Sequence, residues 1–164
     1  GHVYSGRCRG LSPDQRAERI GRGDAYAVRI DGGRALDLTG PLDWTDVHRG
    51  TFEVDLSALG DFVVARKETP TSYHLAVTVD DAAQGVARVT RGEDLLEATH
   101  AHRLLQALLG LDVPVWDHHL LVVDREGRRL AKRLGSPSLR DMRQAGVSPQ
   151  SVLETAAARA IGRA

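Results

Sequence analysis

Residues 73–95 read YHLAVTVDDAAQGVARVTRGEDL, and the prediction of the fold class begins from these residues. Its first part, Tyr73–Val79, is a mostly apolar run, and its second part, Val86–Thr90, is a shorter run that ends at Arg91. Short runs of this kind, rich in β-branched residues and bounded by polar ones, predict two strands.

A helix and two further strands are expected because the apolar spacing changes after Leu95. Apolar residues then recur at intervals of three and four up to Gly110, which predicts a helix with one apolar face formed by Ala98, Ala101, Leu105 and Leu108. Val113–Val115 and Leu120–Val123 read as buried strands. Strand, helix and strand in succession predict an α/β fold for residues 71–164.

Residues 1–70 predict a smaller α+β unit, and the boundary between the two parts is expected near residues 68–71. Ser12 can cap a first helix, because Pro13 suits its first position and Gln15 completes a capping box. Short strands are expected over residues 25–30, 35–38, 51–54 and 62–66, with a turn at 31–33. Near the other end, two helices are expected over residues 139–145 and from residue 148 onward.

The composition is that of an ordinary folded chain of 164 residues. Lysine plus arginine number 22 and aspartate plus glutamate also number 22, so the formal net charge is zero, which excludes attachment to nucleic acid by bulk charge. The one cysteine, Cys8, cannot form an intramolecular disulfide, and the longest aliphatic run, Leu120–Val123, is far too short to span a membrane. We therefore expect a cytoplasmic protein with no membrane partner.

Two segments of opposite charge lie within this neutral total. Residues 31–61 hold seven acidic residues and two arginines, a balance of −5, whereas residues 125–143 hold seven basic and two acidic residues, a balance of +5. Such runs are usually solvated faces, and the alternative for the basic run is a segment that faces phosphates. Composition alone leaves both interpretations open.

Arg91 and Tyr73 are the strongest candidates for a ligand site. An arginine at the C-terminal end of a parallel strand lies where α/β folds bind ligands, and its planar guanidinium matches a carboxylate. Tyr73, before a neighbouring strand, can add a hydroxyl to the same pocket. The alternative is a structural role, in which Arg91 pairs with Asp94 or Glu97 and Tyr73 lies in the core.

The histidines carry a weaker signal. His100 and His102 are two apart on the expected helix and point to different faces, and the adjacent His118 and His119 alternate across a strand. Structural or surface roles are therefore favoured for each histidine.

Tyr4, Cys8 and Lys132 complete the set of candidates. Tyr4 and Cys8 are four residues apart and can face one metal ion, but a structural zinc site needs four ligands. Lys132 lies in the basic segment 128–133, and lysine in such a loop can neutralise charge on a phosphoryl or nucleotidyl group.

Residues 73–95 resemble the second half of the catalytic domain of glutamyl-tRNA synthetases. Within that family, the chain is most similar to the branch that glutamylates queuosine in tRNA(Asp) and has no anticodon-binding domain. Tyr4-x3-Cys8 followed by Arg9-Gly10 resembles half of that branch's zinc site, and Arg129–Arg133 occupies the place of the KMSKS loop.

The resemblance implies a two-step reaction. ATP with Mg²⁺ activates glutamate to glutamyl-adenylate, and the glutamyl group then passes to queuosine in the anticodon of tRNA(Asp). By position in the family's motifs, Tyr73 and Arg91 contact the glutamate, Lys132 is the catalytic residue that contacts ATP, and Tyr4 and Cys8 are zinc ligands. The full-length enzyme is expected to be a monomer.

The resemblance also assigns a role to each part of the chain. Residues 71–164 match the C-terminal half of a class I Rossmann-like catalytic domain, and residues 1–70 match a remnant of the zinc-binding insertion. The first half of the nucleotide site and a Cys-x-Cys zinc pair have no counterpart, so we expect the isolated chain to be inactive and its zinc site incomplete. The alternatives are a fragment of an ordinary glutamate–tRNA ligase and a non-catalytic remnant that binds RNA or a nucleotide.

Overall fold

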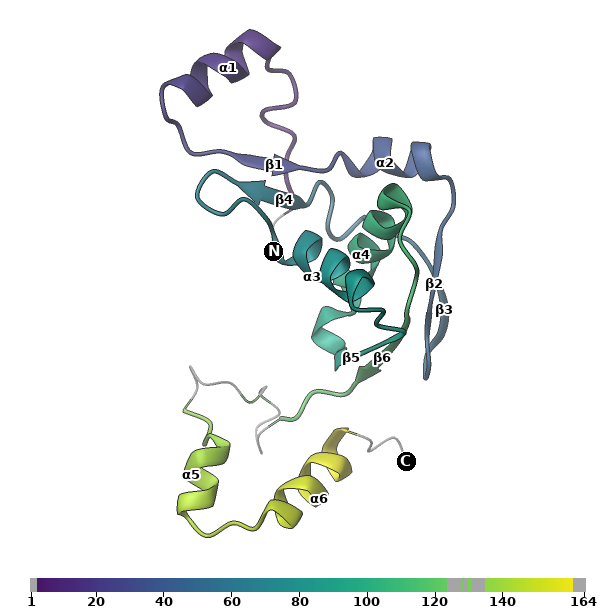
Figure 1. Ribbon diagram of the computed structural model, residues 1–164, viewed down its shortest axis with the longest axis vertical. Helices are drawn as coiled ribbons and strands as arrows, with labels where there is room; N and C mark the ends of the chain where they lie inside the picture. Colours follow the sequence, from purple (N-terminus) through teal and green to yellow (C-terminus); the bar gives the residue numbers. More distant parts are fainter. Residues whose placement is uncertain (1–2, 124–127, 129, 131–134, 161–164) are drawn as a thin grey trace.

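The computed structural model describes residues 3–123, 128, 130 and 135–160, which form the helices and strands labelled in Figure 1. In chain order these are α1 Pro13–Gly21, β1 Ala27–Arg29, α2 Gly32–Thr39, β2 Asp43–Asp46, β3 Gly50–Glu53, β4 Val63–Arg66, α3 Tyr73–Ala83, β5 Arg88–Gly92, the 3-10 turn η1 Glu93–Leu95, α4 Leu96–Leu109, β6 Val115–His119, α5 Leu139–Gln144 and α6 Pro149–Ala160. None of the helices in the described part of the chain is long and apolar enough to cross a membrane.

The main sheet has four strands in the order β3-β2-β6-β5. β2 and β3 form an antiparallel hairpin, whereas β6 runs parallel to both of its neighbours. β5 and β6 pair from Arg88 opposite Val115 to Gly92 opposite His119. The parallel pairing confirms the predicted α/β fold class, and β1 and β4 form a separate two-stranded antiparallel sheet.

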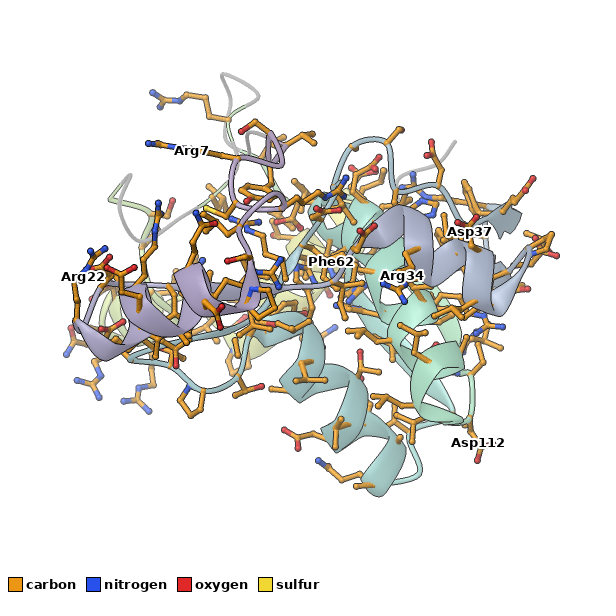
Figure 2. All side chains as sticks on the ribbon, turned by 90° about the horizontal axis from the view of Figure 1, so that it is seen from above. Arg7, Arg22, Arg34, Asp37, Phe62 and Asp112 are labelled. Atoms are coloured by element: carbon orange, nitrogen blue, oxygen red, sulfur yellow. The ribbon has the colours of Figure 1, made fainter. Side chains whose placement is uncertain are left out.

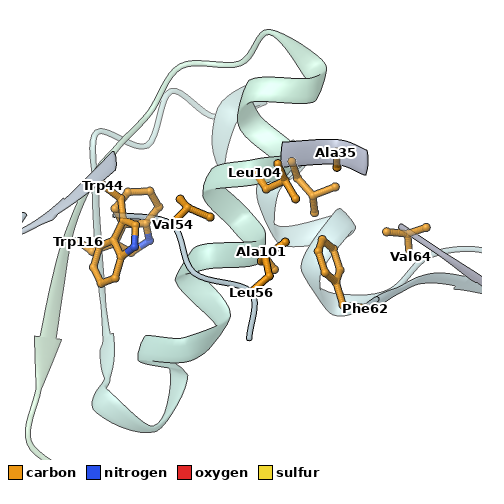
Figure 3. Packing of buried hydrophobic residues seen from close by; sticks show 10 residues of the cluster. Ala35, Trp44, Val54, Leu56, Phe62, Val64, Ala101, Leu104 and Trp116 are labelled. Carbon is orange, nitrogen blue, oxygen red and sulfur yellow. The ribbon is translucent and has the colours of Figure 1, made fainter. Parts of the chain in front are cut away.

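Helix α4 lies at the centre of the hydrophobic core, as the spacing of its apolar residues predicts. Ala101 and Leu104 are 0% exposed, and Gly110 ends the helix in the left-handed conformation with φ of 64°. Leu108, at 37% exposed, is the one residue of the predicted stripe that does not join the core. Figure 3 shows α4 against β2, β4 and β6, in a cluster of Ala35, Trp44, Val54, Leu56, Phe62, Val64, Ala101, Leu104, Leu105 and Trp116.

This core takes residues from both sides of residue 70, and so does the main sheet, in which β2 pairs with β6. The division into residues 1–70 and 71–164 stays a prediction about the family's architecture. In the structure, the two parts share one sheet and one core, and α1 lies at one end of the molecule with α5 and α6 at the other (Figure 1).

The strand predicted over Tyr73–Val79 is wrong, because helix α3 contains these residues. The hydroxyl of Ser72 caps the helix by accepting the N–H of Leu75 at 3.3 Å. The Thr78 hydroxyl donates to the carbonyl of His74 at 2.8 Å, a bond that Thr side chains make within helices. An apolar run of this length reads equally well as a buried helix, and contact with α4 and β4 decides between the two.

The strand predicted over Ala35–Leu38 is also wrong, because this segment lies in α2. The preceding Asp31 caps the helix, and its carboxylate accepts the N–H of Arg34 at 3.2 Å. Gly32 is closely packed, since a Cβ there would lie 2.9 Å from Cδ1 of Leu56 and 3.2 Å from the carbonyl oxygen of Gly60. The aspartate and glycines read as a hairpin turn, whereas they begin a helix.

A single strand, β6, replaces the two buried strands predicted over Val113–Val115 and Leu120–Val123. β6 contains polar residues, and His118 within it is 0% exposed. Its backbone N–H and its imidazole both donate to the carboxylate of Asp46 in β2. The strand β6 does not read as an apolar run, because it contains polar residues. These can be buried because their hydrogen-bond partners, such as Asp46, come from a distant part of the sequence.

Other predicted elements are confirmed. The capping box of Ser12 and Gln15 is present at the start of α1, and β1, β3, β4, β5, α4, α5 and α6 fall on or within a residue or two of the expected segments.

The acidic segment of residues 31–61 is only in part the solvated face expected from its charge. Figure 2 shows Asp37 at the outer edge of the molecule, on the opposite side from Arg7 and Arg22 near α1. Asp46 and Asp61, in contrast, are 1% and 7% exposed and form internal hydrogen bonds. The two buried carboxylates of this segment therefore organise the fold.

Candidate active site

Arg91 lies at the C-terminal end of β5 and binds three neutral side chains. Its Nε donates to Nε2 of His118 at 3.1 Å, its Nη1 donates to Nδ1 of His102 at 3.1 Å, and its Nη2 donates to Oγ1 of Thr99 at 2.5 Å. Two of these partners come from α4 and one from β6, so the strand end and the helix together hold the guanidinium.

The positive charge of Arg91 has no bound carboxylate within the described part of the chain. Burial lowers the pKa of Arg91, and Tyr73, Asp81 and Asp94 oppose that shift from nearby. None of the ion pairs among the described residues includes Arg91. Three of the five guanidinium N–H groups are used, which leaves two for the Tyr73 hydroxyl or for an anionic ligand.

The predicted alternative, in which Arg91 is a structural partner of Asp94 or Glu97, does not describe these contacts. The hydrogen bonds of the guanidinium go to two imidazoles and one hydroxyl, and Asp94 acts on it only through its charge.

His102 is a neutral link between Arg91 and His74. Burial, together with Arg91, His74 and His118, lowers the pKa of His102 to about 3. Because its Nδ1 accepts from Arg91, its proton lies on Nε2, which donates to Nδ1 of His74 at 3.1 Å. Burial and Arg91 lower the pKa of His74 as well. The Arg91 end of β5 is therefore surrounded by uncharged imidazoles.

His118 connects Arg91 to a buried carboxylate. Its Nδ1 lies 2.8 Å from Oδ2 of Asp46, and both side chains are 0% exposed. Burial raises the pKa of Asp46, but the hydrogen bonds from His118, His48 and Arg49 outweigh it and hold that pKa below its usual value. Burial lowers the pKa of His118, with Asp46 opposing the shift.

The expectation of separate structural or surface roles for the histidines is therefore incomplete. His100 and His102 do point apart, since Nδ1 of His100 accepts from Nε1 of Trp44 at 3.3 Å and from the Asp55 N–H at 3.0 Å. The strand alternation also holds, because His118 is fully buried and the next residue is half-buried. The sequence does not indicate that the histidines at 74, 102 and 118 converge on Arg91, because three different elements supply them.

Tyr73 is near Arg91, although it begins a helix rather than a strand. Its ring packs edge-on against His102 with 5.7 Å between centroids, and its hydroxyl is close enough to raise the pKa of Arg91. Tyr73 is 52% exposed, so the alternative of a core tyrosine does not hold. The exposed ring beside the half-buried arginine marks the side from which a ligand would approach.

The candidate zinc ligands Tyr4 and Cys8 contact each other. The Cys8 N–H donates to the Tyr4 hydroxyl at 2.7 Å, and the guanidinium of Arg29 lies 4.5 Å from the centre of the Tyr4 ring. Cys8 is exposed. Residues 3–123 and 135–160, with 128 and 130, contain no cluster of three His, Cys, Asp or Glu side chains, so they do not supply a tetrahedral zinc site by themselves.

Lys132 lies outside the described residues, as do residues 125–127, 129, 131, 133 and 134 of the basic segment 125–143.

Comparison of the sequence with known proteins identifies the family of this chain. Residues 2–163 match the sequence profile of class I tRNA synthetases (E and Q), catalytic domain. The chain belongs to this family. Its members are aminoacyl-tRNA synthetases, which are ligases, and the predicted resemblance is confirmed.

Relatives named glutamyl-Q tRNA(Asp) synthetase are similar to this chain over most of its length. The protein from Rhodobacter capsulatus is 46% identical over 93% of the chain and 55% of its own length, and that from Nocardia farcinica is 42% identical over 92% and 46%. Glutamate–tRNA ligase 2 from Syntrophus aciditrophicus is 34% identical over 92% of the chain and 30% of its own length.

The fold agrees with solved structures of the family. The glutamate–tRNA synthetase of Elizabethkingia anophelis superposes with a TM-score of 0.61 at 27% identity, over 82% of this chain and 28% of that one. The chain spans about half the length of its glutamyl-Q tRNA(Asp) synthetase relatives.

Proposed function

We propose that this chain forms part of an enzyme that activates glutamate with Mg²⁺–ATP and transfers the glutamyl group to queuosine in tRNA(Asp). The choice of acceptor rests on relatives named glutamyl-Q tRNA(Asp) synthetase, which are 40–46% identical to this chain, whereas the glutamate–tRNA ligase from Syntrophus aciditrophicus is 34% identical. In the first step a glutamate carboxylate oxygen attacks the α-phosphorus of ATP and pyrophosphate leaves. In the second step the glutamyl group passes to the modified base and AMP leaves.

The observation that carries this proposal is the guanidinium of Arg91. It is a partly buried cation held by neutral acceptors, with two N–H groups left over. A fork of this kind binds a carboxylate with two charge-assisted hydrogen bonds. These acceptors are neutral, and Asp81 and Asp94 act on the guanidinium only through their charge, so a glutamate carboxylate would add a hydrogen-bonded anion.

Tyr73 supports the same role. Its hydroxyl lies beside the Arg91 guanidinium, and its half-exposed ring forms one wall of the approach. We propose that this hydroxyl donates to a substrate oxygen, so that the Arg91 guanidinium and the Tyr73 hydroxyl together hold glutamate.

Lys132 is proposed to neutralise charge on the ATP phosphates. The reaction at the α-phosphorus needs no general base from the protein, because positioning and charge neutralisation supply the acceleration. The balance of +5 over residues 125–143 supports a segment that faces phosphates.

Zinc is proposed for the complete protein, which we define as this chain together with the rest of the polypeptide that its relatives contain. Tyr4 and Cys8 would supply two ligands, and the remaining ligands would come from outside the 164 residues. Zinc would hold these segments together. Metal analysis of the complete protein is expected to find one tightly bound zinc, which Cys8→Ser abolishes.

Pyrophosphate exchange and transfer assays test the proposed function. The complete protein is expected to catalyse glutamate-dependent exchange between ATP and pyrophosphate, and the 164-residue chain alone is expected to be inactive. Transfer should then occur to queuosine-containing tRNA(Asp) and not to tRNA(Glu). Charging of tRNA(Glu) would favour an ordinary glutamate–tRNA ligase, and tRNA binding without exchange by the complete protein would favour a non-catalytic remnant.

A further inference from the structure

We propose that Asp46 and His118 are positioning residues, which fix one protonation form of an imidazole and thereby orient the guanidinium of Arg91. The consequence for glutamate rests on the proposed function, whereas the positioning itself is a property of the fold. Neither residue is within reach of a ligand, because both side chains are completely buried. They act on the site only through Arg91.

The hydrogen-bond partners of its two ring nitrogens determine the tautomer of His118. Nε of Arg91 can only donate a hydrogen bond, so Nε2 of His118, 3.1 Å away, must accept it and be unprotonated. The proton of the neutral imidazole then lies on Nδ1, which donates to Oδ2 of Asp46 at 2.8 Å. In the opposite tautomer two N–H groups would face each other at Arg91.

Backbone hydrogen bonds fix the orientation of the Asp46 carboxylate that accepts the hydrogen bond from Nδ1 of His118. Its Oδ1 accepts the N–H groups of His48 and Arg49, each at 2.9 Å, and its Oδ2 accepts the N–H of His118 at 3.0 Å. Together with the imidazole bond, four donors surround one carboxylate. These bonds also lower its pKa, so Asp46 stays ionised.

The same four donors predict that Asp46→Asn disturbs the protonation form of His118. An amide presents one oxygen and one NH₂ group, so one pair of donors must face the NH₂. If the NH₂ faces Nδ1 of His118, this nitrogen must accept, and the proton moves to Nε2, against Arg91.

Two of the three acceptors of the guanidinium are imidazoles from different elements. His118 receives the Nε bond from β6, and His102 receives an Nη1 bond from α4, so rotation of Arg91 would break both. The guanidinium is thereby held in one orientation, with Tyr73 as a further neighbour. The Asp46 carboxylate thus orients Arg91 through the His118 imidazole, and no proton moves between them.

Nitrogen-15 NMR of histidine-labelled protein tests the positioning directly. In the wild-type complete protein, His118 should show a protonated Nδ1 and an unprotonated Nε2, and Asp46→Asn should reverse them or give a mixture. A protonated Nε2 on His118 in the wild-type protein would overturn the inference. This readout does not depend on activity, so it separates failure of the positioning from failure of the proposed function.

A matched pair of substitutions tests the consequence for glutamate. His118→Gln keeps an acceptor at the place of Nε2, whereas His118→Asn keeps only a donor at the place of Nδ1. In pyrophosphate exchange, His118→Asn should raise the KM for glutamate about tenfold to a hundredfold, because a charged hydrogen bond is lost, and leave the KM for ATP unchanged. His118→Gln should recover most of that loss. Equal kinetics for the two folded variants would overturn the inference and indicate a structural role.

Discussion

Arg91 is the residue on which the proposed glutamate site depends. Arg91→Lys keeps the positive charge but removes the planar fork and the Nε donor that binds His118. Charge-assisted hydrogen bonds contribute about 1.5–3 kcal/mol, so kcat/KM for glutamate should fall on the order of 10–100-fold in pyrophosphate exchange.

Thermal unfolding of the same variant is the control for that loss. If Arg91 were a purely structural residue, Arg91→Lys would lower the melting temperature and leave the kinetics of the folded fraction unchanged. That pattern would contradict the proposed contact with substrate.

His102 predicts a dependence of stability on pH. Its pKa is about 3 in the folded chain, against an ordinary value of 6.5, so the unfolded chain binds more protons between these values. The free energy of unfolding therefore falls as the pH drops below 6.5, and His102 alone accounts for about 2 kcal/mol at pH 5.

The substitution His102→Asn isolates this contribution, because it keeps an acceptor for Arg91 and removes the titrating group. Urea unfolding at pH 7 and pH 5 should show a smaller loss of stability in the variant than in the wild-type protein. An identical loss in the two proteins would contradict the assignment of His102 as a buried neutral imidazole.

The sequence indicates Arg91 and Tyr73 as candidates but not the residues that hold them. Arg91 stands at the end of an apolar run, and its position is visible in the sequence. Asp46 and His118 are 72 residues apart, and no local pattern connects a carboxylate in one strand with an imidazole in another. Such pairs depend on strand order, which periodicity does not give.

Helix α4 is the element that joins the core to the site. Leu104 is 0% exposed, and on the same helix Thr99 and His102 bind Arg91. Leu104→Ala should therefore lower the free energy of unfolding by about 2–5 kcal/mol, through lost burial and the cavity that remains. Leu108→Ala is the matched control, since Leu108 is 37% exposed and should cost less than about 1 kcal/mol.

Urea unfolding monitored by circular dichroism measures both variants. Equal losses for Leu104→Ala and Leu108→Ala would contradict the placement of α4 at the centre of the core.

The type of an element was predictable where a capping or terminating residue was present at its end, as in α1 and α4, and in α4 the spacing of apolar residues agreed with it. It was not predictable for α3, because an apolar run with β-branched residues fits a strand and a buried helix alike. The deciding features are the Ser72 cap and contact with α4, and the second of these is tertiary. The error matters for the site, since the start of α3 is what places Tyr73 beside Arg91.

The distribution of charge over the whole molecule supports separate regions for amino acid and phosphate. The proposed amino-acid region contains Arg91 and neutral histidines, whereas the excess positive charge lies in residues 125–143. Lys132→Ala in the complete protein should slow pyrophosphate exchange on the order of a hundredfold while changing the KM for glutamate little, because its charge acts on the phosphates.

The neighbouring Arg129 and Arg133 make the comparison with tRNA binding necessary. If the basic segment holds tRNA instead, Lys132→Ala will leave exchange unchanged and weaken tRNA binding in a strongly salt-dependent manner. Exchange rates in the absence of tRNA distinguish these outcomes.

The most direct measurement is a crystal structure of the complete protein with glutamate bound. One glutamate carboxylate is expected within hydrogen-bond distance of the two N–H groups of Arg91 that its protein partners leave over, with the Tyr73 hydroxyl on the same ligand and the His118 and His102 contacts retained. Glutamate bound elsewhere, with Arg91 still touching only protein atoms, would contradict the assignment of this cluster as the amino-acid site.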